Sequence, residues 1–489
     1  MYILVVVDNP KYWPLNIQNV EVVQARKYIT EPAFTRIGDA RVFNLCRSYR
    51  YQSTGYYVSL LAAARGHKPI PDVSTIRDLQ FPTIVRLASE TLEEEMDRAL
   101  ADHKGNRFTL SIYFGRNLAK RYDRLSMELF NLFRAPLLRA EFVKEEGKWQ
   151  LQGIGPIAVS EVPESHHAFI VIVASDFFRG RHRRLRPRAQ AAYSMAILTN
   201  PKDEGAPSNP RALEKFIEAA EKIGIDAELI DRDAYSRLPE YDALFIRETT
   251  SVTNHTFRFA RRAEAEGLVV IDDPQSILKC TNKVYLEELL TRHRIPTPKS
   301  IIVHRDNLDL LPYEIGFPLI LKQPDSSYSV GVIKIDNKEQ LEREAPPMLE
   351  DSELLIAQEF LPTEFDWRIG VIDGKPFYAC KYYMARKHWQ IVRREKQTVM
   401  EGRVQAIALR NVPDKVIDVA VKASRLIGDG LYGIDLKQIG NKLYVIEIND
   451  NPNLDAGFED AVVKNRLYET VMKSFLRRIK AAKQLRKSR

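Results

Sequence analysis

The sequence predicts an α/β protein of several domains, and three observations lead to this fold class. Apolar runs typical of buried strands alternate with helical patterns along most of the chain. An arginine-rich stretch that contains a proline divides the chain near residue 180, and two strand-like runs flank a Gly-Asn turn near the C-terminus. With 489 residues and 45% hydrophobic content, the chain is long enough for two to four domains with substantial cores.

The N-terminal region is expected to have α/β architecture. Strands are predicted at Ile3 to Val7, Phe108 to Phe114 and Phe169 to Val173, with helical patterns between them. The densest local pattern is Arg47 to Tyr57, which reads Arg-Ser-Tyr-Arg-Tyr-Gln-Ser-Thr-Gly-Tyr-Tyr and continues into a helical stretch at Val58 to Arg65. We expect its tyrosines to pack at the helix start and its arginines to stack on them.

After the arginine-rich stretch, strand-like and helix-like runs alternate up to residue 271. They are Tyr193 to Leu198, Arg211 to Ile223, Ala227 to Ile230, Ala243 to Arg247, Phe257 to Glu266 and Leu268 to Ile271. This alternation predicts a small parallel sheet covered by helices. Its strand-to-helix turns contain neither G-x-G-x-x-G nor G-x-x-x-x-G-K-[ST], which removes the main support for a dinucleotide site or a P-loop.

The net charge of +8 is concentrated in two short segments. Arg179 to Arg188 contains six arginines and no acid, and Lys473 to Arg489 contains eight basic residues and no acid; without them the net charge would fall from +8 to −6. Because a nucleic-acid footprint normally spreads over a folded face, nucleic acid is not an expected partner. A solvated linker and a solvated terminal helix are expected, and the alternative is that these segments attract an acidic substrate or a phosphate-rich partner.

Compartment and cysteine usage agree with a cytoplasmic protein. No apolar run approaches the length needed to cross a bilayer, and the apolar residues 1–7 meet Asp8 too soon for a secretory signal. The three cysteines, Cys46, Cys280 and Cys380, have no metal-type spacing, and we expect them to be reduced and structural.

The first chemical element is a helix start at residues 281–290. Thr281 or Asn282 can cap this helix, and Lys283 then lies in its first turn. The positive end of the helix dipole disfavours a cation there unless an anion shares the position, and an ATP phosphate would be such an anion.

The second element, Phe317 to Ile335, is a strand, a small-residue loop and another strand. Lys322 ends the first strand and can reach a phosphate. The loop hydroxyls of Ser326, Ser327 and Ser329, together with backbone N–H groups, can cover a triphosphate. The alternative is an ordinary polar hairpin loop.

The third element, Glu353 to Leu361, is a strand that can serve as an adenine hinge. A strand that leaves a sheet edge exposes backbone N–H and C=O groups to the adenine ring. A carboxylate several residues further on can bind the ribose hydroxyls; Asp366 is the first choice and Glu364 the second.

The fourth element, residues 431–452, carries the strongest signal. Two strands flank Gly440-Asn441, and the period of two puts Glu447 and Asn449 on one face. A two-residue loop would set Asp435 opposite Ile446, whereas a three-residue loop would set it opposite Glu447. A metal site that includes Asp435 therefore predicts a loop of odd length, with Gly440 or Asn441 supplying the left-handed residue.

Asp435, Glu447 and Asn449 are hard oxygen donors of the kind that Mg²⁺ prefers when it binds mainly through nucleotide phosphates. Two Mg²⁺ ions bridged by Glu447 would neutralise the charge that develops on a transferring γ-phosphoryl group. The alternative for an acidic pair on a hairpin is a solvated face.

The elements occur in a fixed order: Lys283, Lys322, Gln358 to Leu361, Asp366 to Arg368, Asp435 and Glu447 to Asn449. This set resembles the ATP-grasp superfamily, and is most like its ribosomal-protein glutamate ligase (RimK) branch, over about residues 193–480. The run at residues 47–57 resembles an accessory domain that is fused to one subgroup of RimK-like proteins.

The resemblance implies a domain order and a set of roles. The domains would be an N-terminal accessory domain at residues 1–178, an arginine-rich linker at 179–190, a small pre-ATP-grasp α/β domain at 191–280, an ATP-grasp domain of two α+β subdomains at 281–480, and a basic tail at 481–489. ATP and two Mg²⁺ ions would be cofactors, with Mn²⁺ as an alternative ion. Lys283 and Lys322 would bind ATP phosphates, Gln358, Glu359, Phe360 and Leu361 the adenine, Asp366 the ribose, and Asp435, Glu447 and Asn449 the metal.

Two departures from the family pattern bear on the substrate. The loop Asp325 to Gly331 is poorer in glycine than is usual, which predicts a stiffer cover over the phosphates. The Arg-Ser-Asn-x-x-Arg-Gly-Gly pattern of the glutamate ligases is missing; this chain has Lys381 to Gln390 and then Gly402-Arg403. Because that stretch lies beside the acyl-phosphate site, the resemblance leaves glutamate as substrate an open question.

The expected activity is that of a carboxylate–amine ligase. ATP would phosphorylate a substrate carboxylate, such as that of glutamate, and an amine of a protein, a peptide or a metabolite would attack the acyl phosphate. Arg368, Arg386 and Arg403 are candidates for stabilising the tetrahedral oxyanion, and Arg247 is a weaker candidate for holding the carboxylate substrate. The family often forms symmetric oligomers, and no membrane partner is expected.

Two rival functions come from other classes of protein. One is a catalytically inactive, ATP-binding regulatory protein with the same fold. The side chains at every predicted metal and phosphate position are competent for catalysis, which argues against this rival. The other is a nucleic-acid-binding protein that acts through the two basic segments.

Overall fold

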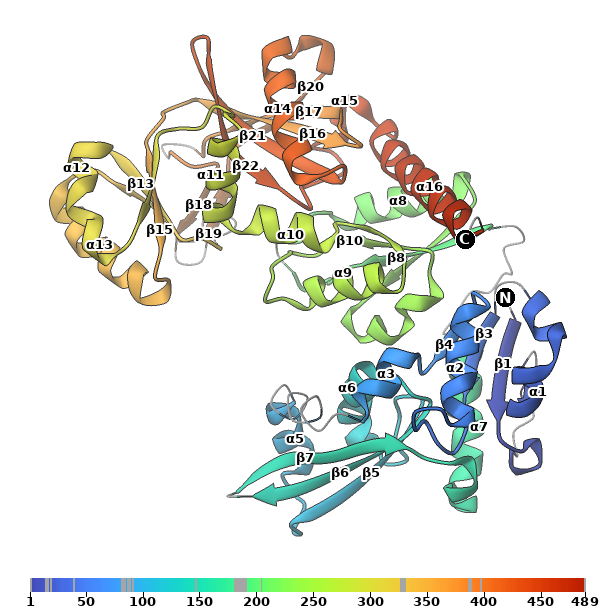
Figure 1. Cartoon of the computed structure of the whole chain (residues 1–489). Coiled ribbons are helices and arrows are strands. Elements are labelled where there is room, and N and C mark those ends of the chain that lie inside the picture. Colours follow the sequence, from blue (N-terminus) through green and yellow to red (C-terminus); the bar gives the residue numbers. More distant parts are fainter. Residues whose placement is uncertain are drawn as a thin grey trace. The chain divides into compact units, whose positions relative to one another are not determined.

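The chain folds into two compact units, Met1–Pro187 and Arg188–Arg489 (Figure 1). The computed structural model describes residues 2–13, 17, 20–37, 40–80, 85, 89, 92–145, 147–179, 191–203, 205–325, 331–385, 389–395 and 398–487. The second unit holds all of the chemical elements that the sequence predicts. No helix in this described part of the chain is long and apolar enough to cross a membrane.

The first unit contains a parallel sheet with the strand order β2-β1-β3-β4. Its strands are β1 (Tyr2–Val7), β2 (Glu21–Gln24), β3 (Ala40–Asn44) and β4 (Lys68–Ile70), and its helices are α1 (Ala25–Thr30), α2 (Thr54–Ala64), α3 (Val73–Asp78) and α7 (Glu164–Arg179). Short 3₁₀ turns are η1 (Pro10–Tyr12), η2 (Pro32–Arg36) and η4 (Val159–Glu161). The predicted strand at the N-terminus and the helix after residue 58 are confirmed.

A three-stranded antiparallel sheet completes this unit. It consists of β5 (Arg107–Tyr113), β6 (Leu137–Glu145) and β7 (Lys148–Pro156), with α5 (Glu93–Leu100), η3 (Lys120–Tyr122) and α6 (Asp123–Leu132). Buried residues of both sheets, such as Leu4, Val42, Leu110 and Phe142, belong to one apolar core. The strand predicted at residues 108–114 is therefore confirmed.

The strand predicted at Phe169 to Val173 is wrong, because these residues lie in the middle of α7. Ile170, Val173 and Ala174 are buried, whereas Ile172 is 61% exposed. Burial at spacings of three and four is the pattern of a helix face, and a short β-branched run cannot by itself distinguish a strand from a buried helix segment.

The tyrosine- and arginine-rich segment at residues 47–57 is only partly packed. Tyr49 is buried and donates a hydrogen bond to the carbonyl of Asn44 (2.5 Å), while the Ser53 side chain caps α2 by accepting from the backbone of Tyr56 (3.3 Å). Tyr51, however, is 61% exposed, and the two arginines of the segment are exposed as well. Among the described residues these arginines make no cation–π contact, so the expected stacking is not found.

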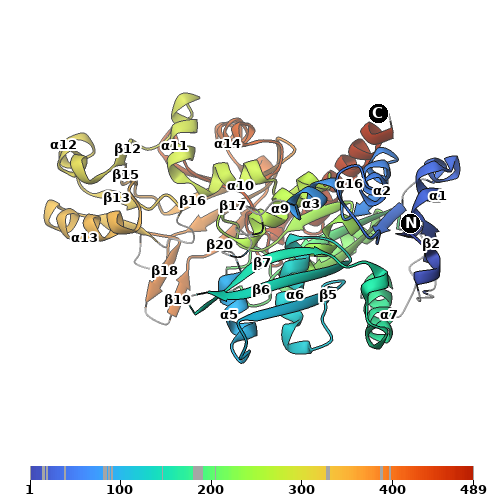
Figure 2. The same ribbon diagram turned by 60° about the horizontal axis from the view of Figure 1, so that its bottom comes forward.

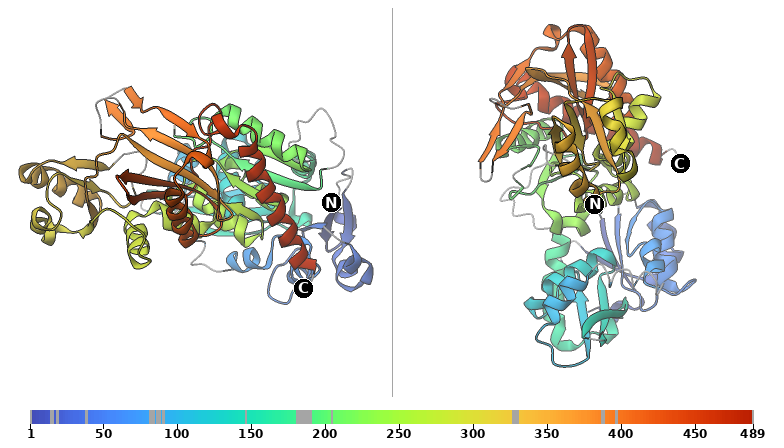
Figure 3. Two further views of the ribbon diagram at one scale, coloured as in Figure 1. Left: turned by 90° about the horizontal axis from the view of Figure 1, so that it is seen from above. Right: turned by 90° about the vertical axis from the view of Figure 1, so that its left-hand side faces the viewer.

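The second unit begins with a four-stranded parallel sheet of order β11-β10-β8-β9, as the alternation predicted. Its elements are β8 (Tyr193–Leu198), α8 (Pro210–Lys222), β9 (Ile225–Ile230), η5 (Arg232–Glu240), β10 (Ala243–Ile246), α9 (His255–Ala265), β11 (Val269–Ile271) and α10 (Pro274–Thr281). The C-terminal helix α16 (Arg466–Lys487) lies beside α8 (Figures 1 and 3).

The expectation of a solvated terminal helix holds for only one side of α16. Leu467, Val471, Phe475 and Ile479 are almost fully buried in the core that also contains Phe216 of α8. The basic residues of α16, such as Lys473, Arg477 and Lys480, lie on its exposed faces. The run of bases near the C-terminus thus belongs to an amphipathic helix that covers the parallel sheet.

Two antiparallel sheets follow in the chain. The first has the order β12-β15-β13-β14 and comprises β12 (Ser300–Val303), β13 (Leu319–Lys322), β14 (Val332–Ile335) and β15 (Leu355–Glu359), with α11 (Lys283–Arg292), η6 (Arg305–Leu310), α12 (Leu311–Glu314) and α13 (Lys338–Asp351). The second has the order β20-β17-β16-β21-β22 and comprises β16 (Phe365–Ile372), β17 (Lys375–Tyr383), β20 (Val404–Ile407), β21 (Leu431–Ile439) and β22 (Lys442–Asn449), with η7 (Leu409–Asn411), α14 (Asp414–Ile427) and α15 (Asp460–Val463). The strands β18 (Val392–Glu395) and β19 (Thr398–Glu401) form a hairpin that extends outward (Figure 2).

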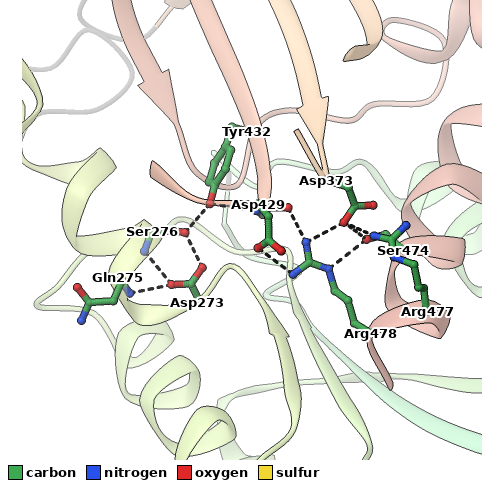
Figure 4. Close-up of polar contacts among 10 residues, drawn as sticks. Asp273, Gln275, Ser276, Asp373, Asp429, Tyr432, Ser474, Arg477 and Arg478 are labelled. Atoms are coloured by element: carbon green, nitrogen blue, oxygen red, sulfur yellow. Dashed lines mark hydrogen bonds and ion pairs between the residues drawn. The ribbon is translucent and has the colours of Figure 1, made fainter. Parts of the chain in front are cut away.

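Polar contacts join the five-stranded sheet to its neighbours (Figure 4). The hydroxyls of Ser276 in α10 and Tyr432 in β21 are hydrogen-bonded at 2.7 Å, and both side chains are buried. Arg478 of α16 donates to Asp373 (2.8 Å) and forms an ion pair with Asp429 (3.2 Å). The three cysteines are buried and unpaired, as expected.

Candidate active site

One pocket lies between the two antiparallel sheets of the second unit. The predicted residues that line it are Lys283, Lys322, Gln358, Glu359, Phe360, Leu361, Asp366, Asp435 and Glu447. These residues span more than 160 positions of the sequence, and only the tertiary fold brings them together. Ser326, Ser327 and Arg386 lie outside the described residues.

Lys283 is the first residue of α11 and faces the predicted metal site. The side chain of Asn282 caps the helix by accepting from the backbone N–H of Tyr285 (3.0 Å), which confirms one of the two expected caps. The Nζ of Lys283 lies 3.1 Å from Oε1 of Glu447. Its backbone N–H donates to the carbonyl of Pro324 (2.9 Å), which ties the helix start to the loop after β13.

Lys322 ends β13 and is 9% exposed. Its ammonium group donates to the amide oxygen of Gln358 at 2.7 Å. The pKa of Lys322 is lowered to about 8, chiefly by burial; Glu447 opposes this lowering, and the neighbouring cations Lys283 and Lys437 add to it. A buried cation next to other cations is costly, and an incoming polyanion would relieve this cost.

The hinge strand β15 pairs with β12 on one side and β13 on the other. This pairing ends at Glu359, and Phe360 and Leu361 continue along the pocket wall. The side chain of Gln358 is fixed by Lys322 and donates to Ser300 (3.0 Å). Further apolar residues line the pocket: Ile320, Val332, Met384, Trp389, Ile391 and Ile446. The pocket thus offers apolar surface next to a strand end, an arrangement that suits a planar base.

Asp366 lines the pocket, whereas Glu364 is exposed outside it. Oδ1 of Asp366 accepts hydrogen bonds from Lys437 Nζ (2.8 Å) and Thr363 Oγ1 (2.9 Å). Lys437 is a pocket residue that the sequence reasoning missed. It stands two positions after Asp435 on β21, so the period of two, applied to β21 as it was to β22, would have found it.

Asp435 lies opposite Glu447, as the metal prediction required, but the predicted reason is wrong. The loop has two residues, Gly440-Asn441, and the register shifts instead at a β-bulge in β22. The extra residue is Ile446, and both Ile446 and Glu447 line the pocket. In a bulge two residues of one strand oppose one residue of its partner, so the strand interior supplies the odd residue that the loop was expected to supply.

Two carboxylates of this hairpin differ in their partners. Arg368 binds Asp435 through both Nε and Nη2, the latter at 2.8 Å, and Asn449 donates its amide to Oδ2 of Asp435 (3.2 Å). Burial nevertheless raises the pKa of Asp435 because it outweighs the effect of Arg368. For Glu447, burial acts to raise the pKa, but Lys283 and Lys322 outweigh it, and the pKa is lowered. Of Asp435 and Glu447, Glu447 is therefore the carboxylate that stays ionised more readily.

The donor set fits a hard divalent cation that is bound mainly by a nucleotide. Two carboxylates face each other, and Asn449, whose amide nitrogen is used by Asp435, has its amide oxygen as a third donor. No group of three or more His, Cys, Asp or Glu side chains with metal-binding geometry occurs among the described residues. With Asp435, Glu447 and Asn449 as donors, phosphate oxygens and waters would complete the coordination of Mg²⁺.

The two described arginine candidates for the oxyanion are placed very differently. Arg368 is buried against Asp435, and its guanidinium lies 4.8 Å from the centre of the Tyr382 ring. Arg403 is exposed, stacks on Tyr383 (4.6 Å) and does not line the pocket. Of these two, only Arg368 contacts a residue of the pocket.

Arg247 is 1% exposed, and its guanidinium is hydrogen-bonded within the protein. It donates to Ser208 Oγ (3.0 Å), to Asn451 Oδ1 (2.6 Å) and to the carbonyl of Pro452 (2.9 Å). These contacts join the parallel sheet to the segment after β22, so the suggestion that Arg247 holds the carboxylate substrate is corrected: its role here is structural.

Two antiparallel α+β halves that hold such a pocket between them define the ATP-grasp class of C–N-bond-forming ligases. Residues 280–465 match the model of the RimK-like ATP-grasp domain, and residues 25–172 match that of the RimK-like ATP-grasp N-terminal domain. The chain belongs to the RimK-like ATP-grasp family and carries both of these domains.

Curated relatives match about half of the chain. A probable α-L-glutamate ligase of Marinomonas sp. (strain MWYL1) is 24% identical over 278 residues, which cover 53% of this chain and 89% of the relative. The α-aminoadipate–LysW ligase LysX of Saccharolobus solfataricus is 26% identical over 265 residues, 50% of this chain and 90% of the relative. The chain is thus an ATP-dependent carboxylate–amine ligase.

Among solved structures, a RimK domain ATP-grasp protein from Sphaerobacter thermophilus superposes with a TM-score of 0.45 at 16% identity, covering 57% of this chain and 98% of that structure. The D-alanine–D-alanine ligase from Bacillus anthracis gives a TM-score of 0.48 at 15% identity and covers 60% of this chain and 99% of that structure.

Proposed function

We propose that this ligase uses ATP and Mg²⁺ to activate the carboxylate of an acidic amino acid, such as glutamate, and joins it to an amine of a protein or peptide. The observation that carries this proposal is the pocket itself. Two lysines, a hinge strand, a ribose-type carboxylate and a facing carboxylate pair converge there from separate elements. The lysines are opposite in charge to the phosphates, and the carboxylate pair is opposite in charge to Mg²⁺.

The lysines would bind and orient the phosphates. Lys283 reaches Glu447 from the helix start, and Lys322 reaches the same region from the end of β13. Both would place positive charge where negative charge develops during transfer of the γ-phosphoryl group to the substrate carboxylate. The amine then attacks the acyl phosphate, forms the amide bond and releases phosphate, so no protein nucleophile is needed.

The other polar residues would fix the nucleotide and the metal. Asp366, held by Lys437, would bind the ribose hydroxyls, and the apolar wall with the end of β15 would hold the adenine. Asp435, Glu447 and Asn449 would hold Mg²⁺, which when bound neutralises phosphate charge. Arg368 would keep Asp435 oriented and ionised near the reacting groups, which makes it the better placed of the two described candidate arginines to act on the oxyanion.

The choice of an acidic amino acid rests on the relatives. The names of two of them specify glutamate and α-aminoadipate, and both are dicarboxylic amino acids. The missing Arg-Ser-Asn-x-x-Arg-Gly-Gly pattern means that the residues which select the acid are not those of the glutamate ligases, so the screen described next includes other acids.

The test is ADP release from Mg-ATP by wild type and by Glu447→Gln, screened against pooled amino acids together with peptide amines, with products identified by mass. We expect one pool to give an amide of matching mass, and Glu447→Gln to lower its formation by roughly a thousandfold, because it removes a metal-site charge needed in the transition state. Glu364→Gln changes an exposed carboxylate that lies just before β16 and does not line the pocket; it is the control and should leave the rate unchanged.

Amide formation that is equal in wild type and Glu447→Gln would disprove the assigned site. Product formation with neutral or basic amino acids alone would disprove the acidic substrate and leave the ligase assignment intact.

A further inference from the structure

A second hollow of the second unit lies far from the ATP pocket. It has a volume of about 660 Å³ and is formed by the β16–β17 turn, the segment after β20, and helices α15 and α16. Its apolar lining includes Ile372, Phe377, Leu409 and Val463, and we call this hollow the basic groove because of the side chains around it.

Among the described residues, five cations line the basic groove against a single acid. They are Lys375, Arg410, Arg466, Lys473 and Arg477. All five are exposed, with the side chains of Lys473 and Arg477 64% and 62% accessible to solvent.

The negative charge of the single acid, Asp373, is already balanced by arginines of the protein (Figure 4). Its Oδ1 accepts from Ser474 Oγ (2.9 Å) and from Arg478 Nη2 (2.8 Å), and Arg477 binds the same oxygen. These hydrogen bonds outweigh the effect of burial and lower the pKa of Asp373. The carboxylate therefore stays charged, and its charge is shared between two arginines.

Three of the cations, Lys375, Arg410 and Arg466, form no ion pair with any residue that the structure describes. Lys473 has only Glu469 as a described partner, at 3.5 Å on the helix surface. A concave surface with unpaired positive charge above an apolar floor complements a ligand that carries both carboxylates and apolar side chains.

The basic groove and the ATP pocket lie at opposite ends of the same strand. Asp366 near the start of β16 lines the pocket, and Ile372 at its end lines the groove. Six residues of extended chain separate them by about 20 Å. A ligand in the groove would therefore not touch the reacting groups, but a peptide held there has a free end that can reach them.

We propose that the basic groove binds an acidic peptide segment of the protein whose amine is the acceptor. The role of this protein as the amine acceptor rests on the proposed function, but binding of its acidic segment to the groove does not. The apolar floor favours a peptide over nucleic acid, whose binding surfaces extend along a folded face. Of the basic residues of α16, Lys473 and Arg477 line the groove, each with one acidic partner in Glu469 and Asp373, whereas Arg478 and Lys483 lie outside it.

The probe is a fluorescein-labelled peptide of about twelve residues, rich in glutamate and aspartate with interspersed leucines, which is long enough to fill the groove and span about 20 Å. Binding to the full chain is followed by anisotropy at several ionic strengths. The test variant is Arg410→Glu/Arg466→Glu. The control is Arg305→Glu/Lys422→Glu, which changes the net charge equally at exposed positions that line neither hollow.

We expect the test variant to bind the peptide about tenfold more weakly than wild type and the control to match wild type, with the difference shrinking as salt screens the charges. Equal binding by the test variant and the control would overturn the proposal. So would a single-stranded DNA of equal charge that binds more tightly and displaces the peptide.

Failure of the groove and failure of the proposed function are distinguishable. Glu447→Gln should bind the peptide as wild type does, because the groove is remote from the reacting groups. Peptide binding without any ligase product would count against the proposed function alone, whereas amide formation on small amines without peptide binding would count against the groove alone. Arg410→Gln/Arg466→Gln, with thermal unfolding as a folding check, replaces the charge reversal if that variant does not fold.

Discussion

The two ends of strand β16 carry cations in opposite ways. At the ATP pocket, Lys322 is buried and Lys283 contacts Glu447, so each positive charge is held in place before a ligand arrives. At the basic groove, Lys375 and Arg466 are exposed and have no counterion among the described residues. Buried charges are strongly coupled to one another, whereas exposed charges are screened by solvent. The pocket is therefore built for positioning, and the groove for attraction.

Removing the buried cation should give the largest effect. Lys322→Met is expected to lower kcat/KM for ATP by about a hundredfold, because a preorganised charge at the phosphates is lost. Steady-state ADP release measures it, and Lys338→Met, at an exposed position of α13, is the control. Unfolding temperatures should not fall, because removing a buried cation relieves a desolvation cost; a large drop would mean that Lys322 serves the fold instead.

The pH dependence of ATP binding sharpens the same contrast. Since the pKa of Lys322 is lowered to about 8, its charge is present below pH 8 and is lost as the pH rises through 8. The affinity of the free protein for ATP should therefore fall by up to about tenfold between pH 7 and pH 9. Lys322→Arg keeps its charge throughout this range and should show a flat profile in calorimetric titrations. A flat profile for wild type as well would contradict the lowered pKa.

The ribose assignment should give a smaller effect. Asp366→Asn is expected to raise the KM for ATP about tenfold, because the amide makes weaker hydrogen bonds to hydroxyls than a carboxylate does. It should also reduce the preference for ATP over 2′-deoxy-ATP, which competition assays measure. Glu364→Gln should change neither quantity. If Glu364→Gln has the larger effect on this preference, the second choice for the ribose ligand is the right one.

Near the groove, one arginine is structural, and its loss should give the smallest effect. Arg478→Gln should lower the free energy of unfolding by about 1–2 kcal/mol, because it breaks partly buried contacts with Asp373 and Asp429. Chemical denaturation measures this, and Lys480→Gln, exposed on the same helix, is the control. Peptide binding by Arg478→Gln should stay within about twofold of wild type, because Arg478 does not line the groove.

The hairpin of β21 and β22 marks the limit of what sequence reasoning could reach. The alternation and the Gly440-Asn441 turn were enough to predict two paired strands, and the metal hypothesis then required Asp435 to lie opposite Glu447, as it does. They did not identify the bulge at Ile446, because a bulge has no strong residue signature and the same register follows from a longer loop. The identity of the site residues thus followed from the sequence, while the backbone geometry did not.

Helix α7 and Arg247 show the same limit elsewhere. A run of β-branched residues is compatible with a strand or with a buried helix, and only the packing of Ile170 and Val173 in a common core decides between them. An arginine at a strand end suits either a substrate or a structural clamp. The acceptors that bind Arg247 are the hydroxyl of Ser208, about 40 positions away, and the oxygens of Asn451 and Pro452, about 200 positions away. No local sequence pattern predicts these contacts.

The sequence by itself determined the α/β class, the order of the phosphate, hinge and carboxylate elements, and the family, because these depend on local periodicity and on residue types along the chain. The tertiary structure alone decided which of these residues share a pocket, how far burial lowers the pKa of Lys322, and that bases from α16 meet Lys375 and Arg410 around one groove. Burial and charge proximity are properties of three-dimensional packing, and residues distant in sequence create them.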